Sequence, residues 1–283
     1  LQTLLITIFN ANQEFKKIVG IQISTNILLF VSSFYFIYQQ ELEGAFFAIA
    51  IADFVSFFVA VFFVRKQFSF SFKFQSHYLK TISKFIGMAL VSAILIPVTA
   101  ILIRNYIIDN SSLYNAGIWE AITRISGFYM MFFSAGLSMY YLPKLSELNT
   151  DAEFKKELLY YFKTLVPLFI LALFLVFVAK NWIIDYVLAS KFQMVKSLLI
   201  WQLLGDLFKI MTLAFGYQIL VKAMLNKYLI IEIIFNLLFY FGVLFLLKQF
   251  SVEGAVMAYF YANVITFLVV LYFFRKLIYV KKS

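Results

Sequence analysis

Long apolar runs separated by short polar loops make up most of the chain. A helix needs roughly 20 residues to cross the hydrocarbon core of a bilayer. Runs of about that length occupy 18–38, 44–64, 82–103, 116–142, 158–179, 197–221, 228–247 and 254–274. Residues 1–11 look like the tail of one more such helix. We therefore predict an all-α polytopic membrane protein with eight full transmembrane helices and a partial one.

Two segments of the chain resemble each other when they are aligned without gaps at an offset of 210 residues. Segments 42–66 and 252–276 share Glu-Gly-Ala near the start and Arg-Lys at the end. Asp53 falls opposite Asn263. Both copies run in the same direction, which is typical of parallel repeats in membrane transporters, related by an axis along the membrane normal. Chance similarity between two apolar segments is the alternative interpretation.

The same offset predicts how the chain is organised into domains. Residues 80–210 have no repeat partner within the chain. We expect that partner to precede Leu1, in a molecule of about 413 residues with two parallel six-helix halves. Residues 1–66 would then be the C-terminal part of the first half, 67–79 a cytoplasmic linker between the halves, and 80–283 the whole second half.

The composition supports a membrane protein, because 64% of the residues are hydrophobic and only 13% are charged. The net charge of +10 does not indicate nucleic-acid binding, since the basic residues sit in short loops between apolar runs. One alternating set of loops holds sixteen of them. The other set holds Arg104, Lys180, Lys191, Lys196 and Lys248. The excess of Lys and Arg in cytoplasmic loops predicts a cytoplasmic C-terminus.

Charged residues inside the predicted helices are candidates for function, because a charge in hydrocarbon costs several kcal/mol. Glu120 and Arg124 are four residues apart and share a helix face. In one interpretation Arg124 binds an anionic headgroup and Glu120 orients it or carries a proton. In the other, the two residues only neutralise each other. Asp206 and Lys209, three residues apart, form a second such pair at a substrate cavity or at the membrane edge.

Three more residues inside the predicted helices are candidates for a role in conformational change or coupling. Asp53 lies near the middle of 44–64, and Glu232 lies closer to the start of its helix. Either carboxylate is a candidate for ion coupling, because desolvation favours its protonated form. Pro97 removes a helix hydrogen bond and is a candidate hinge, although helix packing alone also explains it. We also expect Pro143 to end its helix.

Several kinds of chemistry have no signature in the sequence. The chain has no cysteine, which excludes disulfides and thiolate metal sites. It has no Walker A motif, no nucleophile elbow and no cluster with metal-ligand spacing. We therefore predict no enzymatic activity, no catalytic residues, no bound metal and no cofactor.

Two blocks of sequence resemble a known family. The first comprises GIWE at 117–120, RIS at 124–126 and YYLPKLS at 140–146. The second comprises SKF at 190–192, WQLLGDLFK at 201–209 and FGY at 215–217. These blocks are similar to the Wzx-type O-antigen flippases, and especially to the branch that includes lipid III flippases. The family belongs to the MATE-like multidrug/oligosaccharidyl-lipid/polysaccharide exporter superfamily.

The resemblance implies a function at the bacterial inner membrane. Undecaprenyl-diphosphate-linked oligosaccharides would be flipped from the cytoplasmic to the periplasmic leaflet, for the biosynthesis of lipopolysaccharide and other surface polysaccharides. Arg124 and Lys209 would offset the diphosphate charge, and Asp53 or Glu120 would couple transport to an ion gradient. The implied partners are the lipid-linked oligosaccharide, membrane lipids, and the polymerase and chain-length regulator of the pathway, with no nucleic acid.

Two other functions stay open at the level of sequence. A cation-coupled multidrug antiporter of the same superfamily is one, although cationic substrates favour an acidic cavity and two basic residues lie inside the predicted helices. A membrane polysaccharide polymerase or ligase is the other. It would be supported by a large periplasmic loop rich in Arg, and the sequence has none.

Overall fold

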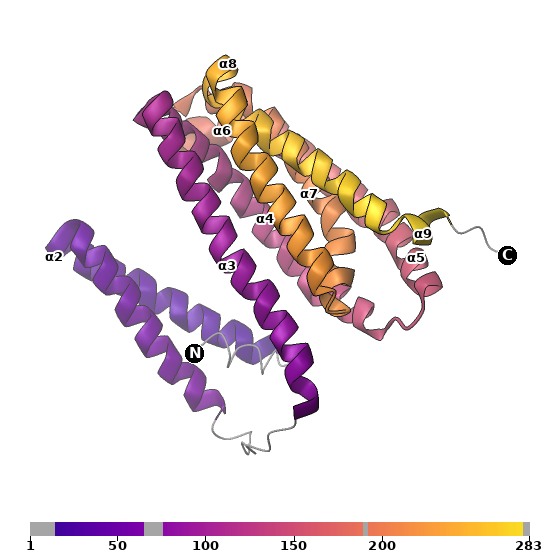
Figure 1. Cartoon of the computed structure of the whole chain (residues 1–283). Helices are drawn as coiled ribbons and strands as arrows, with labels where there is room; N and C mark the ends of the chain where they lie inside the picture. The colour runs from indigo at the N-terminus through magenta and orange to yellow at the C-terminus, as the bar shows by residue number, and fades with distance from the viewer. Residues whose placement is uncertain (1–14, 65–75, 189–191, 280–283) are drawn as a thin grey trace. The chain divides into compact units, whose positions relative to one another are not determined.

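The computed structural model describes residues 15–64, 76–188 and 192–279 (Figure 1). These three ranges contain helices and the turns between them but no strand, so the all-α prediction is confirmed for them. The chain divides into two compact units, Leu1–Phe74 and Gln75–Ser283. Each unit is described by itself below.

Among the described residues, five helices are long and apolar enough to cross a membrane. They are Lys16–Gln39, Ile82–Asn110, Asp151–Tyr186, Val195–Val221 and Leu225–Phe273. The predicted count of eight is not confirmed. The helix that carries Glu120 and Arg124 is not among the five, and Leu225–Phe273 counts once although it has 49 residues. A straight helix of that length would measure about 74 Å, more than twice the ~30 Å hydrocarbon core.

The first unit contains helix α2, Phe15–Val64, which folds back on itself as a hairpin. The Ser32 hydroxyl lies 3.3 Å from the Ala48 carbonyl, which it could not reach along a straight helix. A Cβ atom added to Gly44 would lie only 2.0 Å from the Phe36 carbonyl oxygen. Glycine therefore lets the two legs of α2 meet backbone to backbone.

The second unit is a bundle of helices (Figure 1). In chain order it comprises α3 (Ser76–Asn110), α4 (Leu113–Glu147), α5 (Asp151–Tyr160), η1 (Tyr161–Leu165), α6 (Val166–Val187), α7 (Val195–Val221), α8 (Leu225–Phe273) and α9 (Arg275–Tyr279). Helix α7 is central, because it packs against α4, α6 and α8. Helix α3 packs mainly on α8. The polar residues of α7 are therefore the ones most enclosed by protein.

Helix α8 is a second hairpin, and it reverses at Ser251, where φ is 53°. A Cβ atom on Gly254 would lie 2.2 Å from the Leu246 carbonyl oxygen. Further along the two legs, a Cβ atom on Gly242 would lie 3.1 Å from that of Ala258. Gly242 and Ala258 stand 210 positions after Ser32 and Ala48, which meet in α2. The repeated sequence thus forms the same kind of hairpin in each unit.

The structure corrects one predicted helix boundary. Helix α4 continues past Pro143 to Glu147, whereas we expected Pro143 to end it. Tyr141 and Leu145, on either side of the proline, are fully buried. The Tyr141 hydroxyl also donates to the Ala214 carbonyl of α7 at 3.1 Å. Tertiary packing therefore holds the last turn of α4 in place despite the hydrogen bond that proline removes.

A π-helical turn, η1, separates α5 from α6 and lies directly before Pro167. Proline has no N–H to donate to the carbonyl four residues earlier, and its ring crowds that carbonyl. The wider π turn at Lys163 relieves this conflict, so the helical path continues into α6. Tyr161, within the same turn, is fully buried and donates to the Ile210 carbonyl of α7 at 2.9 Å.

Candidate functional site

Helix α4 carries the first predicted pair. Ser112 caps the helix, because its side chain accepts a hydrogen bond from the backbone N–H of Asn115. Glu120 and Arg124 follow about two and three turns later on one face. The Arg124 Nε–H donates to Glu120 Oε1 at 3.1 Å, so the predicted contact between the two side chains is present.

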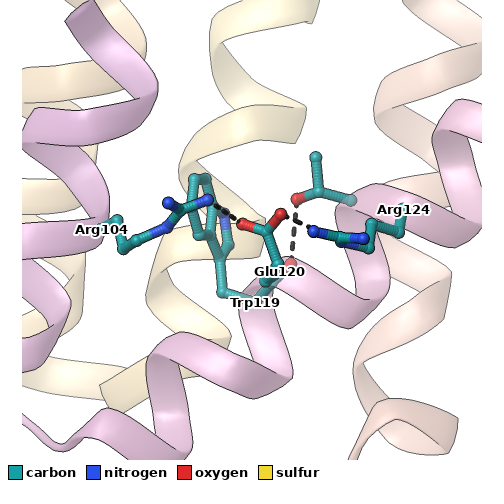
Figure 2. A network of polar contacts seen from close by, with 5 residues as sticks. Arg104, Trp119, Glu120 and Arg124 are labelled. Carbon is teal, nitrogen blue, oxygen red and sulfur yellow. Dashed lines mark hydrogen bonds and ion pairs between the residues drawn. The ribbon is translucent and has the colours of Figure 1, made fainter. Parts of the chain in front are cut away.

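Glu120 also binds a second arginine that the sequence analysis did not select. Arg104 of α3 donates from Nη2 to Glu120 Oε2 (Figure 2). One carboxylate therefore bridges two guanidinium groups, and the three residues carry a net charge of +1. We had placed Arg104 in a loop after residue 103, but α3 continues to Asn110. The apolar residues Tyr106, Ile107 and Ile108 after Arg104 were the signal for a longer helix.

The Glu120–Arg124 pair lies at a cavity of about 660 Å³ between α4 and α6. The rest of its lining is predominantly apolar and aromatic, and includes Phe128, Phe132 and Val176. The Arg124 side chain is 74% exposed. Its Nε–H serves Glu120, so its terminal N–H groups can bind a ligand oxygen. An apolar cavity with a guanidinium group at one place suits a molecule with a hydrocarbon part and an anionic part.

Asp206 of α7 is fully buried, and hydroxyl groups surround its carboxylate. Oδ2 accepts hydrogen bonds from Ser126 at 2.6 Å and from Tyr129, both on α4. Oδ1 accepts one from Tyr259 of α8 at 2.7 Å. Asp206 thus links three helices by hydrogen bonds. These hydrogen bonds offset the free-energy cost of burying its charge.

Gly205 explains how α8 comes so close to Asp206. A Cβ atom on Gly205 would lie 2.6 Å from Tyr259 Cδ1 and 3.3 Å from the Cα of Phe260. Small residues commonly allow such close approach between helices in membrane proteins. The approach brings the Tyr259 hydroxyl over the carboxylate.

Lys209 is exposed, and in the described structure it forms no ion pair with Asp206. It lines a second cavity, between α4, α7 and α8. The two residues of the predicted pair therefore have separate roles. The Asp206 carboxylate is structural, and the Lys209 ammonium group is available to a ligand. The partners of Asp206 could not be found from spacing along one helix, because they come from two other helices.

Glu232 of α8 belongs to a smaller polar cluster with α3. The Ser92 hydroxyl donates to Glu232 Oε1 at 2.7 Å, and the Tyr228 hydroxyl donates to the same oxygen at 3.2 Å. Ser92 and Tyr228 lie 2.6 Å apart. The cluster links α3 to α8 and leaves Glu232 partly buried, so its role in ion coupling stays a prediction.

The remaining predicted residues receive no test from the geometry. The side chain of Asp53 lies outside the described part of the structure, and only its place in the second leg of α2 is known. Pro97 lies inside α3, which continues through it, and its action as a hinge stays a prediction. Within the three described ranges, no group of three or more His, Asp or Glu side chains could hold a metal ion.

Comparison with known proteins gives two matches among curated sequences. The lipid III flippases of Escherichia coli (strain K12) and of Shigella flexneri are each 33% identical to the chain over 187 residues. These matches support a relationship to the Wzx-type flippases. The resemblance predicted from the two sequence blocks is thereby confirmed. The aligned region is 66% of this chain and 45% of each relative, so the chain spans about half the length of the relatives it matches.

No protein-family model matches the chain. No solved structure matches it significantly. The two curated relatives, together with five apolar helices in the described ranges, indicate a multi-pass membrane protein.

Proposed function

We propose that this protein is a flippase that moves undecaprenyl-diphosphate-linked oligosaccharides, of the O-antigen or a related type, across the bacterial inner membrane. The two relatives named lipid III flippase support lipid-linked oligosaccharide flipping in general. The proposal also specifies O-antigen as the substrate, the inner membrane as the location and a cytoplasmic C-terminus. The proposed protein partners are the polymerase and the chain-length regulator of the pathway.

The observation that carries the proposal is an apolar cavity lined by Glu120 and Arg124, with Arg104 bound to the same Glu120 carboxylate. A lipid-linked sugar has a long hydrocarbon chain, a diphosphate and a polar headgroup. The guanidinium groups would bind diphosphate oxygens, since arginine matches phosphate geometry with paired donors. Glu120 would hold both guanidinium groups in position and reduce their charge, so that the substrate can also be released.

Alternating access would follow from rocking two six-helix halves about the substrate. Residues 1–66 would belong to the first half, 67–79 would link the halves, and 80–283 would form the second half. The matching hairpins of α2 and α8 support this arrangement. Asp53 in the first half would be the coupling acid, because its repeat partner Asn263 has no titratable group.

The test is genetic. The full-length protein is expressed in strains that lack their own flippase, and surface polysaccharide is measured together with lipid-linked intermediates. We expect the wild type to restore surface polysaccharide in a strain with a compatible substrate, and the Arg104→Ala/Arg124→Ala variant to lose most of that activity. Lys180→Ala is the matched control, because Lys180 lies near the end of α6 over the Phe177 ring. Unimpaired flipping by the double variant, at normal abundance, would contradict this site.

The carboxylates Asp206 and Glu232, each held by hydroxyl groups, favour a cation-coupled multidrug antiporter as the second candidate. Both functions are compared in the same strains. Resistance to cationic drugs without any restoration of surface polysaccharide would favour the antiporter.

A further inference from the structure

A second cavity, of about 170 Å³, lies between α4, α7 and α8. It is smaller than the α4–α6 cavity, and both polar and aromatic side chains line it. The residues that matter here are Trp119, Ser126, Gln202, Lys209, Phe239 and Tyr259. The volume corresponds to roughly six water molecules at ~30 Å³ each. It therefore fits one small polar group and not a lipid chain.

Gln202 is the clearest sign that a polar ligand belongs in this cavity. It is only 4% exposed, and it lines the cavity. Its amide forms no hydrogen bond with any other residue in the described ranges. Among the described residues, the fully enclosed side-chain atoms without a partner are Glu157 Oε1 and Gln218 Oε1. The Gln202 amide is not one of them, so it is open to the cavity and can bind water or a ligand there.

Two more residues with donor groups, Trp119 and Lys209, line the same cavity. The Trp119 side chain is 4% exposed, and its indole N–H has no hydrogen-bond acceptor among the described residues. Lys209 adds an ammonium group with three donors. The nearby carboxylate of Asp206 is already occupied by three hydroxyls. The cavity therefore offers more donors than acceptors, and a ligand rich in oxygen atoms would satisfy them.

The aromatic residues of the cavity indicate which class of ligand it binds. Three aromatic residues, Trp119, Phe239 and Tyr259, line the cavity. Large apolar rings together with a few polar groups give a ligand both its orientation and its specificity. A sugar ring fits this combination, because it has C–H groups on its faces and hydroxyl oxygens around its edge.

The cavity walls are also held in place. Ser126 and Tyr259, which line the cavity, both donate to Asp206 from different helices. Asp206 is thereby a positioning residue, which fixes α4 and α8 around the cavity without contacting its content. A preformed pocket avoids the cost of ordering its walls when a ligand binds.

We propose that this cavity is a binding site for one sugar ring of the lipid-linked substrate. The inference rests on the flippase function proposed above. Trp119 lines this cavity and its neighbour Glu120 lines the larger one, so the two cavities border the same turn of α4. The hydrocarbon chain and the diphosphate would occupy the α4–α6 cavity, and a sugar would occupy the α4–α7–α8 cavity beside Gln202 and Lys209.

The test uses Trp119 as a local probe in the purified full-length protein. Phe replaces Trp182, Trp201 and any tryptophan outside residues 1–283, so that Trp119 is the one tryptophan of the protein. The ligands are farnesyl diphosphate and farnesyl diphosphates that carry one glucose, N-acetylglucosamine or glucuronic acid. We expect at least one glycosylated lipid to lower acrylamide quenching of Trp119 about threefold, as a ligand that covers most of the indole would. The bare lipid should leave the quenching unchanged.

Substitution of Gln202 then links the effect to the cavity. Gln202→Leu should weaken binding of the protecting glycosylated lipid about tenfold, the size of one lost hydrogen bond in a buried site. Binding of bare farnesyl diphosphate should not change. Gln218→Leu is the matched control, because Gln218 lies on the same helix, is 5% exposed and does not line the cavity. Thermal unfolding of each variant shows whether it is folded.

The outcomes separate the two proposals. Equal protection of Trp119 by bare and glycosylated lipids would overturn the sugar site and leave the flippase function in place. An equal loss of affinity in Gln202→Leu and Gln218→Leu would also overturn the sugar site and leave the flippase function in place. Absence of binding by all four lipids, together with failure of genetic complementation, would overturn both proposals.

Discussion

Gly44 and Gly254 take the same place in two helical hairpins, 210 residues apart in the chain. Each glycine faces the backbone carbonyl of the residue eight positions earlier, Phe36 in α2 and Leu246 in α8. An added Cβ atom would lie 2.0 Å from the first oxygen and 2.2 Å from the second. Both contacts involve backbone, which cannot move aside as a side chain does. The shared Glu-Gly-Ala sequence therefore reflects a shared turn.

This geometry predicts that Gly254→Ala destabilises the α8 hairpin. The methyl group cannot be accommodated without separating the two legs, so we expect a loss of unfolding free energy of about 1–3 kcal/mol or more. Thermal unfolding of the purified protein measures it. Gly136→Ala in α4 is the control, because nothing lies within 4 Å of its added Cβ atom. That variant should be neutral or gain up to about 1 kcal/mol, and equal effects of the two substitutions would contradict the turn geometry.

The all-α class of the described residues was predictable from the sequence, because hydrophobic run length is a local property, whereas the predicted count of eight transmembrane helices is not confirmed. The predicted runs 197–221 and 228–247 fall within α7 and α8. Errors occurred where tertiary packing extends a helix, as at Pro143, and where a helix carries a charge near its end, as at Arg104. In each case a single residue appeared to end the apolar run, while neighbouring helices hold the following turn in place.

The Arg104–Glu120 contact gives a second prediction. A double-mutant cycle of Arg104→Ala and Glu120→Ala should show a coupling energy in stability of about 0.5–1 kcal/mol, because the Arg104 side chain is 46% exposed and solvent screens the pair. Flipping in the complementation strain should fall further in Arg104→Ala than this small loss explains. A wild-type level of surface polysaccharide in Arg104→Ala would limit Arg104 to a structural role.

The polar contacts of the site were only partly predictable. Spacing identified Glu120 with Arg124, which lie one helical turn apart. It could not identify Tyr129 and Tyr259 as partners of Asp206, because their contacts depend on how three helices pack. Gln202 was visible only as part of a sequence block, since its place in the lining of a cavity can be recognised only once the surrounding helices are placed.

The hydroxyl groups around Asp206 give a third prediction. Asp206→Asn replaces one acceptor oxygen with a donor, so at least one of the three hydroxyls loses its partner. We expect a loss of about 1–3 kcal/mol in unfolding free energy. Tyr259→Phe in the Asp206→Asn background should then cost less than it does in the wild type, because the two side chains share one contact. Strictly additive losses would show that Tyr259 does not depend on Asp206.

The last prediction concerns the start of α5, where Thr150 and Glu153 form a capping box. The Thr150 hydroxyl accepts from the Glu153 backbone N–H at 3.2 Å, and the Glu153 carboxylate accepts from the Thr150 N–H at 3.1 Å. Thr150→Ala should reduce unfolding free energy by about 1 kcal/mol, as the loss of a cap does elsewhere. Thr150→Ser keeps the hydroxyl and should retain most of the stability. The start of α5 lies outside both cavities, so flipping should persist in Thr150→Ala at equal abundance. A selective loss of transport would instead show that the start of α5 takes part in the conformational change.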